Sequence, residues 1–266
     1  MESWQDMDRA ALDDAYANAD HIADAAAYPP RWAAEAADFR ARSDVSTIAY
    51  GPGEAEALDL FRPEGAPHGL VVFVHGGYWR RFGRSDWSHF AEGALSAGYA
   101  VAMPGYPLAP GARIAEITAC IARAVDRAAE DVSGPIRLTG HSAGGHLVAR
   151  MIMADAAPAC IARIATCVPI SPVADLRPLV PQSMNDDLRL DAAEAVAESP
   201  ALGHPLAGPA VTVHVGAEER PSFLWQADAL GAAWDVPVRR APGRHHFDVI
   251  DALRDPASPL MRDILA

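Results

Sequence analysis

Short apolar runs that alternate with helical patterns constrain the fold of this chain more than any other feature. The run at 70–74 (LVVFV) is apolar throughout and lies between turn signals, as expected of a strand buried on both faces. Later strand candidates lie at 99–103, 136–139, 164–170, 211–215 and 236–240, with helical patterns at about 86–97, 112–130, 143–155, 221–234 and 247–254. This alternation predicts an α/β fold with a mostly parallel central sheet and helices on both faces.

The remaining segments complete a single-domain prediction. Residues 6–26 and 31–42 look helical and are separated by Tyr28-Pro29-Pro30, so residues 1–44 are predicted to form an N-terminal helical extension, a candidate cap over a site. Two strand candidates at 45–50 and 57–61 flank GPGE and indicate an antiparallel hairpin. The α/β domain then covers 45–266, and 174–208, where the strand signal is weak, is predicted to be an insertion near the site.

Composition excludes several classes of function. The net charge of −13 argues against nucleic acid and anionic membrane surfaces as partners, because both are negatively charged. No segment approaches the roughly 20 apolar residues of a membrane span, and the acidic N-terminal segment lacks the apolar region of a secretory signal. Three cysteines without C-x-x-C spacing indicate neither a disulfide framework nor a zinc site. We therefore expect a protein of the reducing cytoplasm.

A serine lies between glycines where a predicted strand meets a predicted helix. The sequence GHSAG at 140–144 fits the nucleophile elbow G-x-S-x-G in both sequence and context. Such a turn holds the serine, here Ser142, in a strained conformation at the carboxyl end of a strand, and it leaves the N–H of Ala143 free at a helix start. The alternative is a glycine-rich turn whose serine caps the helix.

A serine nucleophile needs a base, and in this arrangement the histidine follows late in the chain. His214 lies within the apolar run VTVHV, which favours a structural role in the sheet, and His204 precedes a proline in a loop. His245 and His246 follow the last strand candidate and precede a helical pattern, where the base is expected. The residues alone leave the choice between these two neighbours open.

The base in turn needs a carboxylate to orient it. The loop after the strand candidate at 211–215 offers Glu218 and Glu219, and its position favours Glu219 ahead of Glu218. Asp175, which follows the preceding strand candidate, is an alternative. Asp248 is too close to His246 along the chain to orient it easily.

An oxyanion intermediate needs preorganised hydrogen-bond donors. HGGYW at 75–79 follows the buried run at 70–74 and resembles an HGGG-type oxyanion loop, with Tyr78 in place of the third glycine. The N–H groups of Gly76, Gly77 and Ala143 are the predicted donors. Neither H-E-x-x-H nor comparable spacing occurs, so we predict no metal site.

The motifs HGGYWR, GHSAGGHL, ISPVADLRPL and HHFDVI together resemble the arylformamidase (kynurenine formamidase) branch of the α/β-hydrolases, close to the hormone-sensitive-lipase-like esterases. The resemblance covers roughly residues 65–255. In that branch the base precedes a phenylalanine, which implies His246, and the acid is an aspartate in a G-x-x-D-x-P-x-F pattern, where GAEERPSF places Glu219.

The resemblance implies an α/β-hydrolase fold and hydrolysis of a small amide or ester through an acyl-enzyme, with no cofactor. An aryl formamide such as N-formylkynurenine is the expected substrate, and Tyr78 and Trp79 would wall an aromatic pocket unless they serve ordinary packing. Alternatives are a carboxylesterase, thioesterase or lactonase on the same scaffold, and a ligand-binding protein without activity. A homodimer is compatible with the sequence.

Overall fold

The computed structural model describes residues 3–266 and contains the predicted mostly parallel sheet. Its strands run in the order β1-β2-β4-β3-β5-β6-β8-β9, and the short β7 pairs with β6. Their bounds are β1 Val45–Ala49, β2 Ala57–Phe61, β3 Leu70–Val74, β4 Ala100–Pro104, β5 Ile136–His141, β6 Ile164–Ile170, β7 Ala210–Val211, β8 Val213–Gly216 and β9 Val238–Ala241. The predicted hairpin is confirmed, since β1 and β2 pair antiparallel across the GPGE segment.

The strand register brings three loops to one end of the sheet. The pair β2–β4 is antiparallel, whereas the strands from β4 to β9 pair in parallel. Val74 at the end of β3 pairs with Gly140 in β5, and His141 at the end of β5 pairs with Ile170 at the end of β6. Residues 75–79 (HGGYW), called the HGG segment below, therefore leave the sheet beside Ser142 and the segment after β6.

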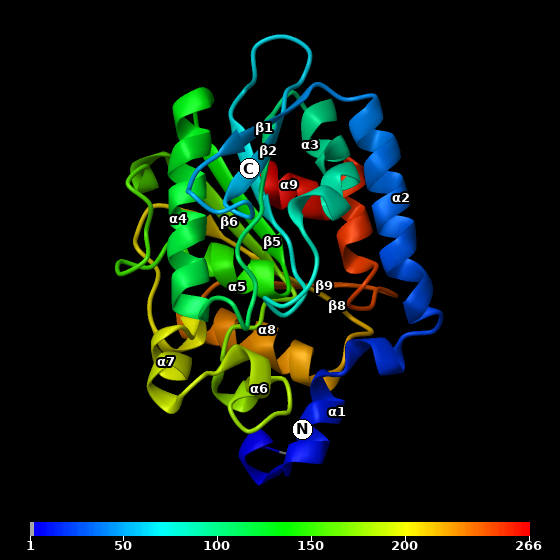
Figure 1. Ribbon diagram of the computed structural model, residues 1–266, viewed down its shortest axis with the longest axis vertical. Helices are drawn as coiled ribbons and strands as arrows, with labels where there is room; N and C mark the ends of the chain where they lie inside the picture. The colour runs from blue at the N-terminus through cyan, green and yellow to red at the C-terminus, as the bar shows by residue number, and fades with distance from the viewer. Residues whose placement is uncertain (1–2) are drawn as a thin grey trace.

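Helices cover both faces of the sheet, as predicted (Figure 1). One apolar cluster joins the sheet to α4 (Ile114–Asp131), α5 (Ala143–Arg150) and α8 (Pro221–Trp234). The other joins it to α2 (Tyr28–Ala41), α3 (Glu92–Ser96), α9 (Pro259–Leu265) and the 3-10 helices η4 (Arg84–Ala91) and η8 (Val249–Arg254). Alternation along β3 explains the division, because Val72 and Val74 face the first cluster while Val71 and Phe73 face the second.

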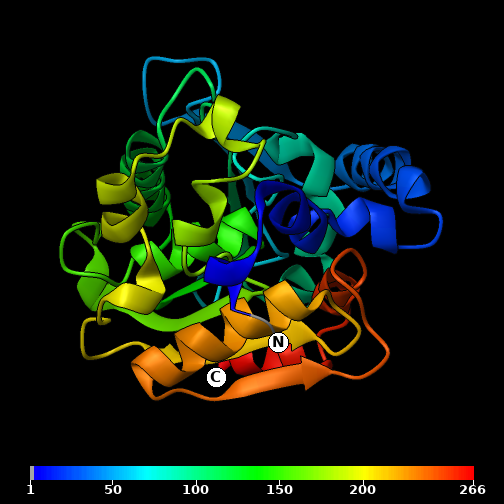
Figure 2. The same ribbon diagram turned by 90° about the horizontal axis from the view of Figure 1, so that it is seen from below.

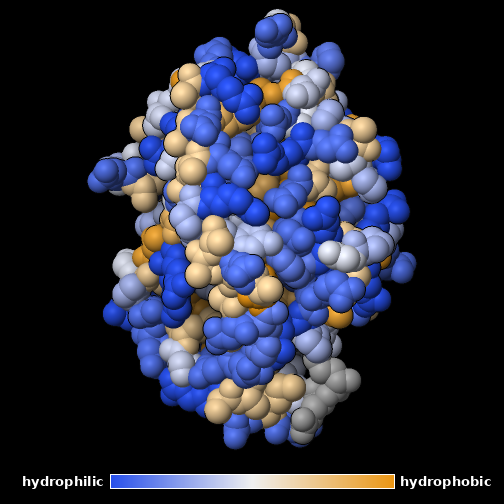
Figure 3. Space-filling view, turned by 90° about the vertical axis from the view of Figure 1, so that its right-hand side faces the viewer, coloured by the Kyte–Doolittle hydropathy of each residue, from blue (hydrophilic) through white to orange (hydrophobic). Residues whose placement is uncertain are grey.

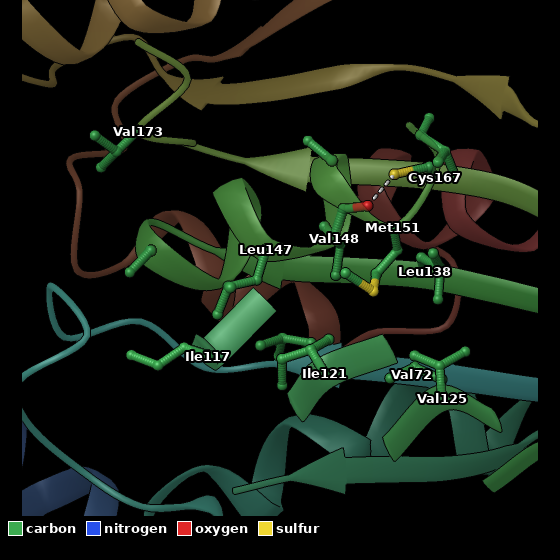
Figure 4. Packing of buried hydrophobic residues seen from close by; sticks show 14 of the residues in the cluster. Val72, Ile117, Ile121, Val125, Leu138, Leu147, Val148, Met151, Cys167 and Val173 are labelled. Atoms are coloured by element: carbon green, nitrogen blue, oxygen red, sulfur yellow. Dashed lines mark hydrogen bonds between the residues drawn. The ribbon is translucent and has the colours of Figure 1, made fainter. Parts of the chain in front are cut away.

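The first cluster packs α4 and α5 against the sheet in close contact. Figure 4 shows Ile117, Ile121 and Val125 of α4 on one side and Leu147 and Val148 of α5 beside them. All of these side chains are fully buried. The dashed line in Figure 4 joins the thiol of Cys167 in β6 to the carbonyl oxygen of Val148 at 3.4 Å. Cys167 thus behaves as a small core residue.

The N-terminal region differs from the prediction of one long helix over 6–26. It contains η1 (Trp4–Asp6), α1 (Arg9–Tyr16), η2 (Asn18–His21) and η3 (Ala25–Ala27), and Asp24 has a positive φ of 54° that interrupts them. α2 begins at Tyr28, three residues before the predicted start, because prolines at the first positions of a helix need no N–H partner. The surface on the side of α2 is mostly hydrophilic with small apolar patches (Figure 3).

Short helices fill the segment 174–208. The helical pattern at 186–198 forms two helices, α6 (Asn185–Leu188) and α7 (Ala192–Ala197), because Arg189 between them is left-handed with φ 56°. The 3-10 helices η6 (Arg177–Leu179) and η7 (Pro200–Leu202) flank them, and η5 (Ile161–Arg163) precedes β6. α1 lies near α6 and α8 at one end of the molecule (Figures 1 and 2), where Arg9 pairs with Asp186 at 3.2 Å.

Truncation of a core side chain tests the packing of α4. Ile121 is fully buried between α4 and the sheet, so Ile121→Ala should lower the free energy of unfolding by about 3 kcal/mol through lost burial and a cavity. Val196 is 51% exposed, so Val196→Ala is the matched control and should change stability by less than about 0.5 kcal/mol. Urea unfolding followed by circular dichroism measures both, and equal effects would contradict the packing described.

Candidate active site

The serine predicted as a nucleophile lies in a strained turn between β5 and α5. Ser142 has φ 56° and ψ −116°, a conformation rarely adopted by residues other than glycine. Its N–H donates to the carbonyl oxygen of Ile170 at 2.9 Å, which fixes the turn to β6. The Ser142 side chain makes no capping hydrogen bond to α5, so it does not serve as a simple helix cap. The residue is buried, with 3% of its surface exposed.

The glycines around Ser142 are required by close backbone contacts. A Cβ atom on Gly144 would lie 1.9 Å from the carbonyl oxygen of Val74, and one on Gly140 would lie 2.4 Å from the carbonyl oxygen of Gly144. Neither neighbour is a flexible side chain that could move away. The two glycines therefore let α5 pass directly over the end of β3 and force the tight turn at Ser142.

His246 and Glu219 form a buried pair. The Nδ1–H group of His246 donates to Oε2 of Glu219 at 2.6 Å, and their side chains are 4% and 0% exposed. Because the carboxylate only accepts hydrogen bonds, this contact assigns the proton of the neutral imidazole to Nδ1 and leaves Nε2 as an acceptor. The ring of Phe223 from α8 packs on the imidazole with 4.2 Å between ring centres.

The other candidate acids and the neighbouring histidine have different surroundings. Glu218 is exposed, and buried Asp175 pairs with the guanidinium of Arg177 at 2.6 Å. Nε2 of His245 is hydrogen-bonded to the hydroxyl of Tyr28 in α2 at 3.1 Å. Of the carboxylates weighed from the sequence, the structure brings Glu219 to His246.

His141 connects the serine turn to the loop that holds His246. Its Nε2–H donates to the backbone carbonyl oxygen of His246 at 2.9 Å, and the two rings lie 4.6 Å apart. Burial holds the pKa of His141 well below its usual range, so the ring is neutral and the donor tautomer is fixed. Within residues 3–266 no hydrogen bond joins Ser142 to His246, yet the contact with His141 places both at the same edge of the sheet. Such bonds often tighten only when substrate is present.

The HGG segment turns next to Ser142. A Cβ atom on Gly76 would lie 2.8 Å from the carbonyl oxygen of His141 and 3.1 Å from Cβ of Ser142, so the two loops touch. Gly77 has φ 110°, which favours glycine. In the part of the chain that the structure describes, the N–H groups of Gly76, Gly77 and Ala143 donate to no protein acceptor. These donors are free to bind an oxyanion.

Tyr78 and Trp79 both have positive φ values, 51° and 55°, but their side chains lie in different surroundings. The indole of Trp79 is completely buried and packs edge-on against the ring of His146 from α5 at 5.1 Å. It thus supports the HGG segment within the core. Tyr78 donates its hydroxyl proton to the carbonyl oxygen of Tyr16 at 2.8 Å, and burial raises the pKa of Tyr78 far enough to keep it neutral.

The N-terminal extension reaches the same site. The ring of Tyr16, the last residue of α1, packs on Phe223 with centres 5.7 Å apart, and Phe223 in turn packs on His246. The Tyr16 hydroxyl accepts a hydrogen bond from the amide of Gln226 in α8 at 2.8 Å. Sequence reasoning singled out neither Tyr16 nor His141, since a single tyrosine in an alanine-rich helix gives no signal. His141 could have been found from its place directly before the serine in GHSAG.

Two kinds of feature are absent from residues 3–266. No group of three or more His, Cys, Asp or Glu side chains there is arranged to hold a metal ion. No helix in the same range has the length and apolar character needed to cross a membrane.

Buried neutral histidines should make stability depend on pH. Burial lowers the pKa of His75 to about 4 and that of His146 to about 3, whereas a histidine in the unfolded chain has a pKa near 6.5. Between these values the unfolded state binds protons that the folded state does not, so the free energy of unfolding falls as the pH falls below about 6.5. At pH 5 the loss should be about 2 kcal/mol for each of these histidines.

Denaturant unfolding at pH 7, 6 and 5 measures this loss. His146→Gln keeps a donor for the carbonyl oxygen of Glu198 and should make the decline less steep, whereas His204→Gln, at an exposed position, is the matched control. A decline as steep in His146→Gln as in the wild type would contradict the expectation.

Proteins of known activity are similar to this chain over most of its length. The kynurenine formamidase of Danio rerio is 27% identical over 234 residues, which cover 81% of this chain and 80% of that protein. The kynurenine formamidase of Salmo salar is also 27% identical, over 235 residues and the same shares of both chains.

Solved structures agree with the architecture. A crystal structure from Silicibacter sp., described as that of a candidate thioesterase, is 54% identical with a TM-score of 0.94 and covers 96% of this chain and 99% of its own. An esterase of Pyrobaculum calidifontis has a TM-score of 0.68 at 18% identity, covering 93% of this chain and 97% of its own, and shows the fold alone. The sequence pattern of the alpha/beta hydrolase fold family matches residues 71–236, so this chain belongs to the α/β-hydrolase family.

Proposed function

We propose that this protein is a serine hydrolase that cleaves a small amide or ester through an acyl-enzyme, and that its substrate is an aryl formamide of the N-formylkynurenine type. The observation that carries the proposal is the buried hydrogen bond between His246 and Glu219 beside the strained turn at Ser142. A neutral imidazole with its Nδ1 proton held by a carboxylate is ready to accept a proton at Nε2.

In the proposed reaction Ser142 Oγ attacks the carbonyl carbon while His246 Nε2 takes the hydroxyl proton. The negative charge that develops on the carbonyl oxygen is bound by the N–H groups of Gly76, Gly77 and Ala143. His246 then gives its proton to the leaving amine or alcohol as the bond to carbon breaks. A water molecule repeats the sequence on the acyl-enzyme and releases the carboxylic acid, which is formate for a formamide.

The surroundings favour a small acyl group and an aromatic leaving group. Ser142 is 97% buried and Trp79 fills the space behind the HGG segment, which suits an acyl group without a side chain such as formyl. Phe223 packs on His246, and Tyr16 and Tyr78 pack on Phe223 in turn, so the base lies against an aromatic cluster. Tyr78 is the member of this cluster that is only partly buried, and its ring is the surface proposed to meet an aromatic leaving group. The similarity to kynurenine formamidases over 81% of the chain supports the same substrate class.

A second candidate is an esterase or thioesterase of small acyl groups. It is favoured by the 54% identity to the Silicibacter protein, which is described as a candidate thioesterase. The same residues would perform the reaction, since only the leaving group differs. We also expect a cytoplasmic protein, in keeping with three free cysteines, and a homodimer is compatible with the proposal.

Loss of the nucleophile tests the reaction class. Ser142→Ala should lower kcat by at least about a thousandfold, because removal of a nucleophile leaves only binding and oxyanion stabilisation. It should also abolish labelling by a fluorophosphonate probe, while Ser88→Ala, a buried serine whose hydroxyl donates to the carbonyl of Ser85, should still be labelled. Equal labelling of wild type and Ser142→Ala would show that another residue reacts with the probe and would exclude the proposed nucleophile. No labelling of the wild type would favour a ligand-binding protein.

A substrate panel separates the two candidates. N-formylkynurenine, short p-nitrophenyl esters and acyl thioesters are compared by kcat/KM with the same enzyme preparation. If the protein is an aryl formamide hydrolase, N-formylkynurenine should have the highest kcat/KM of the panel. A formamide rate far below the ester and thioester rates would replace the first candidate by the second.

A further inference from the structure

The carboxylate of Glu219 has a separate partner for each oxygen. Oε2 accepts from His246, whereas Oε1 accepts from the hydroxyl of Ser171 and from the N–H of Gly216 at 2.8 Å. The side chain is completely buried, so no solvent contact substitutes for a missing donor. The two donors on Oε1 therefore decide which way the carboxylate faces.

Ser171 is held in an unusual conformation where it makes this contact. It is the first residue after β6, it is fully buried, and its φ is 48° although it is not a glycine. Its N–H donates to the carbonyl oxygen of His214 in β8 at 2.7 Å, which anchors the turn to the sheet. A buried left-handed residue persists only when the surrounding structure over-determines it, and such residues cluster at functional sites.

We propose that Ser171 is a positioning residue of the active site: its hydroxyl holds Oε1 of Glu219 so that Oε2 faces Nδ1 of His246. The proposal rests on the proposed function, in which Glu219 orients the base. It assigns a role to a side chain that touches neither substrate nor the reacting atoms.

A glutamate needs such a contact because of its length. Its carboxyl group is separated from the backbone by two methylene groups, and each added rotatable bond widens the range of positions the carboxylate can reach. Gly216 supplies one fixed donor from the backbone, and a Cβ atom there would lie 2.3 Å from the carbonyl oxygen of Arg244, so this backbone approach is closely constrained. With the Gly216 N–H alone on Oε1, the carboxylate could still rotate about that hydrogen bond. The second donor on Oε1, the Ser171 hydroxyl, prevents this rotation.

His141 and Tyr78, which face the pair, are neutral near pH 7. His141 from β5 faces His246, and its pKa is lowered by burial, so it stays neutral in the working range. Tyr78 from the HGG segment faces Glu219, and its raised pKa keeps it neutral as well. Phe223 from α8 is apolar. A change in the acidic limb of the activity profile therefore reports on the His246–Glu219 pair itself.

Two variants separate positioning from stability. Ser171→Ala and Ser171→Gly both remove the hydroxyl, but glycine tolerates the positive φ and alanine does not. Ser171→Gly should therefore be at least as thermally stable as Ser171→Ala. Asp235→Gly is the matched control, because Asp235 is exposed, has φ 53° and lies at the end of α8 without a contact to the pair.

Both Ser171 variants should lose kcat/KM about tenfold through kcat, with KM little changed, because the oriented base is lost and substrate binding is not. Because the carboxylate is then no longer held against Nδ1, the protonated imidazole loses part of its stabilising partner, and the acidic limb of the kcat/KM profile should move to lower pH. Asp235→Gly should keep the wild-type rate and profile. The assay uses the best substrate of the panel.

A second readout does not depend on activity. The Nδ1 proton of His246 should give a low-field proton NMR signal, assigned by its loss in Glu219→Gln, and this signal should shift in both Ser171 variants. Wild-type rates, an unmoved acidic limb and an unmoved signal in Ser171→Gly would overturn the proposal. Full activity of Ser142→Ala would instead refute the proposed function, and the NMR signal would still test whether Ser171 positions Glu219.

Discussion

The contact between α5 and the end of β3 is the constraint on which the site depends. Gly144 passes so close to the carbonyl oxygen of Val74 that any side chain would overlap it, and Gly140 meets Gly144 in the same way. The chain can make this approach only by a sharp turn, which puts Ser142 at a φ that L-residues rarely adopt. Core packing of α5 against the sheet maintains this conformation, so the reactive geometry is a consequence of the fold rather than of local preference.

The ionisable side chains around Ser142 are neutral except at the His246–Glu219 pair. His75, His141 and His146 all lie next to Ser142 or the HGG segment, and burial lowers the pKa of each so that they are neutral. Tyr78 is kept neutral by its raised pKa. Glu219 is the buried acidic group in contact with His246, and its three hydrogen-bond donors satisfy it. Because the dielectric constant is low in this buried site, the electrostatic interaction between the His246 imidazole and the Glu219 carboxylate is stronger than it would be in water.

How much the sequence could predict depended on how local the determining interactions are. The run LVVFV predicted β3 to the residue, because a strand buried on both faces leaves a continuous apolar signature. The prediction of one helix over the alanine-rich segment 6–26 was wrong, because helix propensity is weak evidence when tertiary contacts oppose it. α1 ends at Tyr16. The sequence did not predict α9, because a helix of seven residues is too short to show a periodic apolar pattern. In the site, chain order pointed to Glu219 and to the neighbours His245 and His246, and the family resemblance singled out His246. The contacts of Ser171 and His141 depend on side-chain geometry across neighbouring strands, which has no periodic signature.

The short helix α1 shows how the N-terminal extension and the site depend on each other. A helix of eight residues is unstable alone, and its last carbonyl groups lack partners within the helix. Here those carbonyls are satisfied by side chains from elsewhere: Arg220 donates to the carbonyl oxygen of Asp14, Ser222 to that of Ala15 and Tyr78 to that of Tyr16. Arg220 is the N-cap residue of α8, Ser222 lies in its first turn, and Tyr78 belongs to the HGG segment. The extension is therefore ordered by α8, whose Phe223 packs on His246, and by the HGG segment. Any displacement of α1 removes the acceptor that holds Tyr78. Because Tyr78 directly follows Gly77, the position of the extension and that of the oxyanion donors are coupled through one hydrogen bond.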